Sequence, residues 1–86
     1  IRLAPRNAYL YYNRGNVYVR SKDYQQAIAD YTQAIALDPR LAEAYYNRGL
    51  ALIDSDKTNE GINDLSKAGE LGLYTAYSLI KKHRKQ

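Results

Sequence analysis

The pentapeptide Tyr-Tyr-Asn-Arg-Gly occurs twice in this sequence, at Tyr11–Gly15 and at Tyr45–Gly49, 34 residues apart. Shifting the sequence by the same period aligns many further identical residues, such as Asp30 with Asp64. Self-similarity at a fixed period of about 20–50 residues indicates supersecondary units that stack on one another. We therefore expect an array of repeats rather than one compact core.

Each repeat carries the three- and four-residue apolar spacing of two amphipathic helices joined by a short turn. Asn7 is predicted to cap the first helix, and Asp23 with Gln26 to form a capping box on the second. Pro39 is predicted to end that second helix. The four predicted helices span about residues 7–20, 24–37, 41–53 and 58–71.

The second repeat has glycine at two positions inside its second helix, Gly61 and Gly69. Because each glycine inside a helix costs roughly 1 kcal/mol relative to alanine, we expect this unit to be the weaker copy. Gly72 then breaks the helix. A last amphipathic segment at residues 74–82 is predicted to cap the array with a polar outer face.

Small, large and aromatic residues alternate at fixed offsets on the two helices of each unit. They are Tyr11, Arg14, Gly15, Tyr18, Ala27, Tyr31 and Pro39 in the first unit and Tyr45, Arg48, Gly49, Leu52, Gly61 and Leu65 in the second. In this pattern the chain resembles the tetratricopeptide repeat (TPR) family over nearly its whole length. The resemblance implies an all-α fold, an α-solenoid of two antiparallel helix-hairpin TPR units plus a C-terminal capping helix.

The repeat register also predicts how the chain is divided. Residues 1–5 are interpreted as the tail of a truncated upstream repeat, residues 6–39 and 40–73 as the two TPR units, and residues 74–86 as the capping helix and basic tail. The sequence contains no methionine, so we expect it to be a piece of a longer protein, of bacterial origin.

Two arginines depart from the family pattern, because Arg14 and Arg48 stand where the family usually has leucine. Each coincides with one aspartate on the facing helix, Asp30 or Asp64, and this suggests one ion pair in each repeat. The alternative is that the four side chains are independent surface charges, since exposed pairs contribute only about 0–1 kcal/mol.

The resemblance implies a concave groove, lined by the first helix of each repeat, that binds peptides or other proteins. Tyrosines offer rigid contact area and asparagines can pair with the amides of an extended backbone, so both favour peptide binding. The alternative for Tyr12 and Tyr46 is that they simply pack between repeats. The expected peptide-binding groove consists of Tyr9, Tyr12, Asn13, Asn16, Arg20, Glu43, Tyr46, Asn47, Leu50 and Asp54.

One TPR subfamily, the carboxylate clamp, holds the C-terminal peptides of heat-shock chaperones with two asparagines and several basic residues. Asn16 and Asn47 match the two asparagines, but Tyr12 stands where the clamp uses lysine. The remaining basic residues would come from a third repeat, which the capping helix replaces here. The sequence therefore matches half a clamp, and the identity of the protein or peptide partner stays open.

Self-association is the main alternative function. About three repeats are usually needed to bury a continuous core, so the face that an upstream repeat would cover is expected to be exposed. Two such faces could pair, which would make the chain a homodimer module.

Charge gives little support to nucleic-acid binding. The net charge is +4, from 13 basic and 9 acidic residues, but four of the basic residues, Lys81, Lys82, Arg84 and Lys85, lie in the tail. The rest of the chain is neutral, and basic residues at a helix C-terminus are already favoured by the helix dipole. Contact of the basic tail with nucleic acid is thus a remote alternative.

The residue inventory does not favour an enzyme or a metal site. The chain has no cysteine, its one histidine is His83 in the charged tail, and no glycine-rich phosphate loop occurs. We expect no catalytic residues and no cofactor. No apolar run approaches the roughly 20 residues that a membrane span needs, and no signal-peptide pattern is present, so a cytoplasmic location is predicted.

Overall fold

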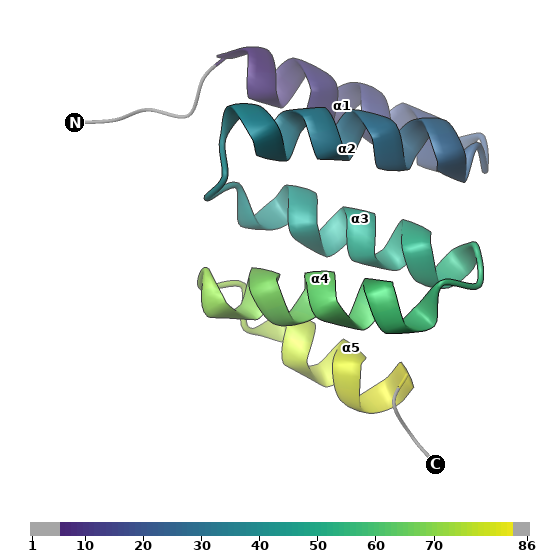
Figure 1. Cartoon of the computed structure of the whole chain (residues 1–86), viewed down its shortest axis with the longest axis vertical. Coiled ribbons are helices and arrows are strands. Elements are labelled where there is room, and N and C mark those ends of the chain that lie inside the picture. Colours follow the sequence, from purple (N-terminus) through teal and green to yellow (C-terminus); the bar gives the residue numbers. More distant parts are fainter. Residues whose placement is uncertain (1–5, 84–86) are drawn as a thin grey trace.

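The computed structural model describes residues 6–83 and consists, over this range, of helices joined by short turns (Figure 1). Each helix packs on the next along the chain, and together they form one layered stack. The expected all-α solenoid is confirmed. The predictions for residues 1–5 and 84–86 concern parts of the chain outside the described residues. The helices are α1 (Arg6–Arg20), α2 (Tyr24–Leu37), α3 (Ala42–Asp54), α4 (Thr58–Glu70) and α5 (Thr75–His83).

The two hairpins turn in the same way. Lys22 and Asp56, which occupy equivalent positions, both have positive φ angles of 62° and 70°. In each turn the next backbone N–H donates back to the end of the preceding helix, from Asp23 to the Tyr18 carbonyl and from Lys57 to the Leu52 carbonyl, at 2.8 Å in both cases. The repeated sequence therefore produces a repeated turn.

Two predictions about helix caps are wrong. Asn7 does not cap α1, because α1 begins at Arg6 and Asn7 lies within it. Asp23 does occupy the N-cap position of α2, but its side chain makes no capping hydrogen bond, so the capping box with Gln26 is not formed. The tight turn sets the backbone of Asp23 at φ −94° and ψ 74°, outside the extended region of ordinary N-caps. The predicted end of α2 is confirmed, since Asp38 is its C-cap and Pro39 follows.

The glycines of the second unit allow its helices to touch. A Cβ atom on Gly61 would lie 2.5 Å from the carbonyl oxygen of Gly49 and 2.6 Å from Cγ1 of Ile53. In the first unit Ala27 stands at the position of Gly61, and the ring of Tyr31 lies over Gly15, the counterpart of Gly49. Gly61 therefore has a packing role in addition to its cost in helix propensity, because a side chain at this position would force α3 and α4 apart.

Two apolar clusters form the core. One contains Ala8, Ala34, Leu41 and Ala44 and joins the first hairpin to α3. The other joins the second hairpin to α5, whose Ala76 and Ile80 are buried against Ile62, Leu65 and Ala68 of α4. The last helix thus covers the apolar side of α4. Among residues 6–83, no helix is both long and apolar enough to cross a membrane.

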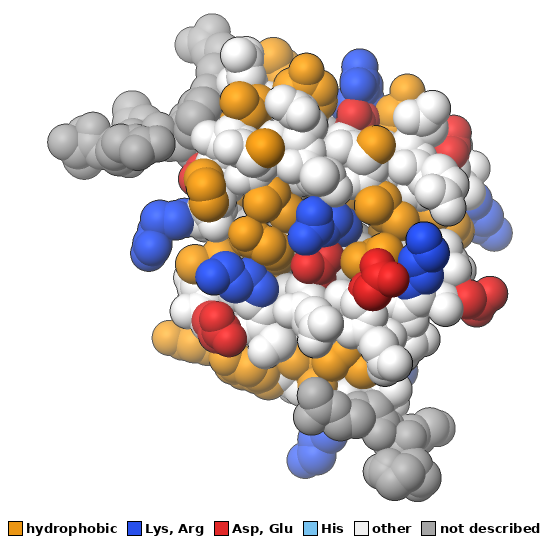
Figure 2. Space-filling model, in the orientation of Figure 1, with side chains coloured by type: hydrophobic (Ala, Val, Ile, Leu, Met, Phe, Trp, Pro, Cys, Tyr) orange, Lys and Arg blue, Asp and Glu red, His pale blue; other side chains and the backbone are white. Residues whose placement is uncertain are grey.

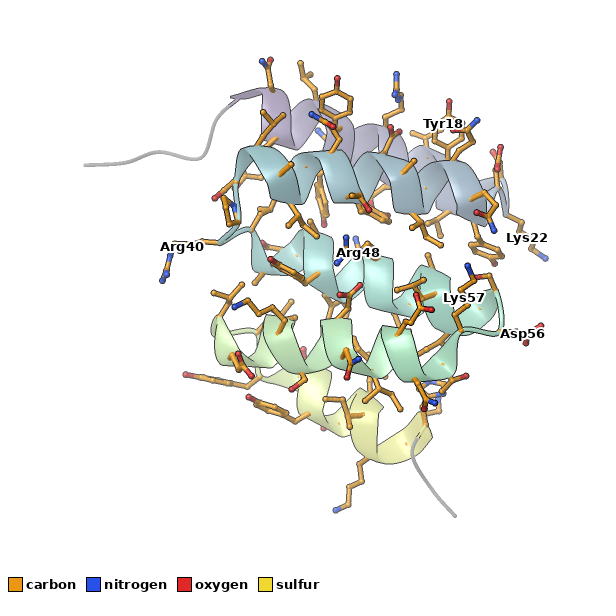
Figure 3. All side chains as sticks on the ribbon, in the orientation of Figure 1. Tyr18, Lys22, Arg40, Arg48, Asp56 and Lys57 are labelled. Atoms are coloured by element: carbon orange, nitrogen blue, oxygen red, sulfur yellow. The ribbon has the colours of Figure 1, made fainter. Side chains whose placement is uncertain are left out.

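Both predicted ion pairs are present. Arg14 donates two hydrogen bonds to Asp30, at 2.7 and 2.8 Å, and Arg48 donates two to Asp64, at 2.7 and 2.9 Å. Arg48 also donates to the hydroxyl of Thr32 on α2, at 3.0 Å, and so links the two repeats. Figure 3 shows Arg48 in the middle of the stack, whereas Arg40 projects away from it.

Candidate functional site

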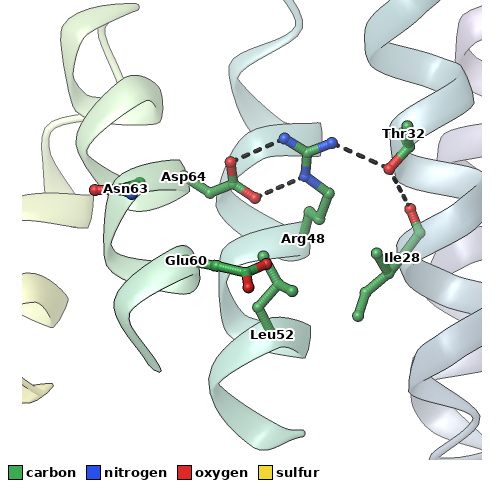
Figure 4. Close-up of a pocket in the computed structure, with 7 residues that line it drawn as sticks. All are labelled: Ile28, Thr32, Arg48, Leu52, Glu60, Asn63 and Asp64. Atoms are coloured by element: carbon green, nitrogen blue, oxygen red, sulfur yellow. Dashed lines mark hydrogen bonds and ion pairs between the residues drawn. The ribbon is translucent and has the colours of Figure 1, made fainter. Parts of the chain in front are cut away.

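Three depressions in the surface of the described chain lie beside α1 or α3. One lies on the outer side of α1 and has a volume of about 470 Å³. A second, of about 390 Å³, lies between α2 and α4 with α3 at its floor (Figure 4). A third, of about 290 Å³, lies between α1 and α3 with Tyr31 of α2 below, and we call it the groove.

The second depression is a structural feature of the face formed by α2 and α4. Arg48 uses its donors on Asp64 and Thr32 across this depression (Figure 4). Its pairing with Asp64 raises the pKa of Arg48 further above its ordinary value. Figure 2 shows basic and acidic side chains side by side across the middle of this face. The arginine charge is therefore already neutralised within the protein.

The groove brings together half of the residues predicted for peptide binding. Helices α1 and α3 touch one another, and this places their polar side chains on opposite walls. The groove is also lined by three residues that were not predicted from the sequence: Val19, Tyr31 and Ala51. The predicted residues that line it are Asn16, Arg20, Asn47, Leu50 and Asp54.

The other predicted residues lie outside the lining of the groove. Tyr46 packs against the core cluster of α4 and α5, so it has a packing role within the second unit and its last helix. Tyr12 has both an apolar and a polar contact. The centroid of its ring lies 5.9 Å from that of Tyr31, and its hydroxyl accepts a hydrogen bond from Asn47. Tyr9, Asn13 and Glu43 are exposed.

A network of four polar side chains crosses the groove floor. The Asn47 amide nitrogen, Nδ2, donates to the Tyr12 hydroxyl at 3.1 Å and to Asn16 Oδ1 at 3.0 Å. Asn16 Oδ1 also accepts the hydroxyl proton of Tyr31. Because Asn16 and Tyr12 come from α1, Tyr31 from α2 and Asn47 from α3, the network ties the first hairpin to the second. It also couples the two asparagine amides, so that neither can turn over without the other.

Tyr31 is the buried member of this network. Burial, and to a lesser extent the neighbouring Tyr12, raise the pKa of Tyr31 to about 12. Its hydroxyl therefore stays protonated at neutral pH and serves as a hydrogen-bond donor. A buried tyrosine usually needs a hydrogen-bond partner for its hydroxyl, so a tyrosine at a core position can point to a polar network. This chain has ten tyrosines and no phenylalanine, and the tyrosine at residue 31 alone therefore does not single out this position.

The groove contains no arrangement suited to a metal ion. Within the described part of the chain, no three histidine, aspartate or glutamate side chains gather closely enough to hold one. The lining instead combines amide, hydroxyl and apolar groups with one basic and one acidic side chain, Arg20 and Asp54. Such a surface suits non-covalent contact with a polar chain.

A stack of antiparallel helical hairpins with an open groove beside successive first helices defines an α-solenoid repeat protein. The particular family follows from two family models. One, described as TPR repeat, matches residues 15–56, and another, described as Tetratricopeptide repeat, matches residues 42–71. The chain belongs to the tetratricopeptide repeat family.

A solved structure with the same fold is the first TPR of Spaghetti (RPAP3) bound to the HSP90 peptide SRMEEVD. It matches this chain with a TM-score of 0.87 and 28% sequence identity, over 95% of this chain and 68% of that chain. Comparison with curated protein sequences gives no match.

Proposed function

We propose that this chain is a protein–protein interaction module whose groove binds an extended segment of a partner protein. The observation that carries the proposal is the convergence of Asn16, Arg20, Asn47, Leu50 and Asp54 on one groove. All five side chains stand on helices that the core holds in place, so little conformational entropy is lost when a partner binds.

The chemistry of the groove fits a peptide rather than a small apolar ligand. Arg20 and Asp54, in the last turns of α1 and α3, offer contacts to side chains of either sign. Val19 and Leu50 add apolar surface between them. The asparagines supply hydrogen-bonding groups suited to a peptide backbone.

The relative of known structure supports this proposal. The first TPR of Spaghetti binds an HSP90 peptide, and its fold matches this chain over nearly all of the chain. A groove between equivalent helices is therefore a reasonable place for a peptide here. The support extends to the mode of binding and not to the identity of the partner, because Tyr12 replaces the lysine that a carboxylate clamp uses.

Selection from a random peptide library, with SRMEEVD as an additional probe, tests the groove. We expect binders whose affinity falls at least about tenfold in an Asn16→Ala, Arg20→Ala variant, since both side chains line the groove. The matched control is Asn59→Ala, Arg40→Ala, which removes the same residue types from exposed positions outside the groove. Binding that depends on neither pair, or no binder at all, contradicts the proposal.

Self-association is the second candidate, and the outer side of α1 favours it. Leu10 is 60% exposed and Val17 50% exposed, whereas their counterparts one repeat later, Ala44 and Ala51, are buried. This apolar strip borders the largest of the three depressions, beside Tyr11 and Arg14. Pairing of two copies through it would bury the strip.

Light scattering across a concentration range distinguishes the two candidates. A doubled mass at micromolar concentration that returns to the monomer value in a Leu10→Glu, Val17→Glu variant would support pairing through α1. A monomeric wild-type chain excludes it and leaves the groove proposal untouched.

A further inference from the structure

The amides of Asn16 and Asn47 are bonded to each other, and this limits what they can offer a ligand. Asn47 uses both hydrogens of its Nδ2, one on Asn16 Oδ1 and one on the Tyr12 hydroxyl. Asn16 Oδ1 accepts from both Asn47 and Tyr31 and so uses both of its lone pairs. These groups are occupied before any partner arrives.

One donor group and one acceptor group of the two asparagines remain free. Asn16 Nδ2 still has two hydrogens, and Asn47 Oδ1 still has its lone pairs, with no protein partner for either atom among the described residues. No buried side-chain nitrogen or oxygen in residues 6–83 lacks a hydrogen bond, so both atoms face solvent. Both residues line the groove, and we take these two atoms as the groups that they offer to a ligand there.

The result does not depend on which way the two amides are turned. Turning both over gives a second self-consistent network, in which Asn16 donates to Asn47, and again one nitrogen and one oxygen face outward. Turning only one places two oxygens or two amino groups against each other at the 3.0 Å separation of the present contact. Such like pairs repel, so the pair cannot present two donors at once.

We infer that Asn16 and Asn47 together bind one residue within an extended segment of the partner, and not its C-terminal carboxylate. In an extended chain the carbonyl and the N–H of one residue point to the same side. The carbonyl would accept from Asn16 Nδ2, and the N–H would donate to Asn47 Oδ1. This inference rests on the proposed function of the groove and names its ligand class.

A terminal carboxylate fits this pair poorly. An ionised carboxylate only accepts hydrogen bonds, so one of its oxygens would face Asn47 Oδ1 with no proton between them. The charges of the groove do not compensate, because Asp54 lines it together with Arg20. The two asparagines shared with the carboxylate clamp thus have a different chemical role here.

Two peptide libraries test this ligand class. In one, random nonapeptides are embedded within a carrier protein; in the other, they end in a free C-terminus. We expect the embedded library to yield groove-dependent binders. On a recovered peptide, amidation should change the affinity less than about twofold, while methylating one backbone nitrogen should weaken binding about tenfold through loss of a hydrogen bond.

Asn16→Asp is the matched protein variant. It keeps the oxygen that accepts from Tyr31 and Asn47 but replaces the outward donor with an acceptor, so binding of the embedded peptide should fall at least about tenfold. Asn59→Asp adds the same charge at an exposed position of α4 and should leave binding unchanged.

Each outcome decides something different. If binders come only from the free C-terminus library, or if amidation abolishes binding, the inference is wrong and the groove proposal stands. If neither library yields a groove-dependent binder, the proposed function itself fails. Should Asn16→Asp fail to fold, the backbone methylation series on the unaltered protein still decides the question.

Discussion

Arg48 and Asp64 form a two-point ion pair between α3 and α4, with nitrogen–oxygen distances of 2.7 and 2.9 Å. The equivalent pair, Arg14 with Asp30, has nearly the same distances but a different environment. The Arg48 side chain is 21% exposed, because α2 covers it, whereas Arg14 is 59% exposed. We therefore expect the two equivalent ion pairs to stabilise their repeats to different extents.

Asp64→Asn should destabilise the protein more than Asp30→Asn. The Asp64 change leaves the mostly covered guanidinium of Arg48 without its counter-charge and should lower the free energy of unfolding by about 2 kcal/mol. After the Asp30 change, Arg14 can turn to water, so the loss should be smaller. Urea unfolding followed by circular dichroism measures both, with Asp23→Asn as an exposed control. Equal losses for the two variants would contradict the argument from exposure.

Gly61→Ala should be far more harmful than Gly69→Ala, although alanine is the better helix former. A Cβ at residue 61 meets the backbone oxygen of Gly49, which cannot move without separating α3 from α4. The atoms nearest to a Cβ at residue 69 belong to the ring of Tyr77, which is 46% exposed and can rotate.

Thermal and urea unfolding would measure the difference. We expect a loss of about 3 kcal/mol for Gly61→Ala, and a change within about 1 kcal/mol for Gly69→Ala. A stabilised Gly61→Ala variant would mean that the close approach of the two helices carries no energetic weight.

Stability should fall between about pH 10 and pH 12 because of Tyr31. Its pKa rises from an ordinary value of 10.0 to about 12 in the folded protein, so the folded state keeps a proton that the unfolded chain loses first. The stability that this proton contributes is complete below pH 10 and is lost as the pH rises through 12, by about 3 kcal/mol in total.

Tyr31→Phe separates this effect from the titration of the other tyrosines. The variant should be less stable at neutral pH, because the hydrogen bond to Asn16 is lost, but its stability should depend less on pH over the same range. Unfolding free energies measured at several pH values from 8 to 12 test the slope. Parallel curves for the two proteins would show that Tyr31 does not titrate abnormally.

The fold was largely predictable from the sequence, and the reason is periodicity. Each predicted helix boundary lies within one residue of the observed one, because the apolar spacing and Pro39 mark where each helix can start and stop. The ion pairs were also predictable, since Arg14 and Arg48 replace apolar residues at the same offset from an aspartate. What failed was local, as at Asp23, where the backbone of the turn and not residue type decides whether a cap forms.

The groove was predictable only in part. Position in the repeat selects the wall residues, but it cannot show which of them bond to one another across repeats. Asn16 and Asn47 are 31 residues apart, three fewer than the repeat period, so they do not occupy equivalent positions of the two units. Their contact joins one unit to the next and has no counterpart within either unit. It depends on how closely α1 and α3 approach, which is set by tertiary packing and not by any local sequence pattern.

Tyr12→Lys should change the ligand class of the groove. The substitution removes the hydroxyl that accepts from Asn47 and supplies the lysine that a carboxylate clamp uses at this position. One hydrogen of Asn47 Nδ2 becomes free, and an ammonium group now stands beside the groove. We expect the affinity for SRMEEVD to rise at least about tenfold, through a charge-assisted contact with the terminal carboxylate.

Calorimetric titration with SRMEEVD and with its C-terminal amide tests this gain. The gain should disappear with the amide and shrink as salt is raised from 50 to about 500 mM, because screening weakens a partly exposed charge pair. Tyr9→Lys is the matched control, since it adds the same charge to α1 at an exposed position one turn away. If both lysines raise the affinity equally, the effect is one of net charge and does not depend on the position of residue 12 beside Asn47.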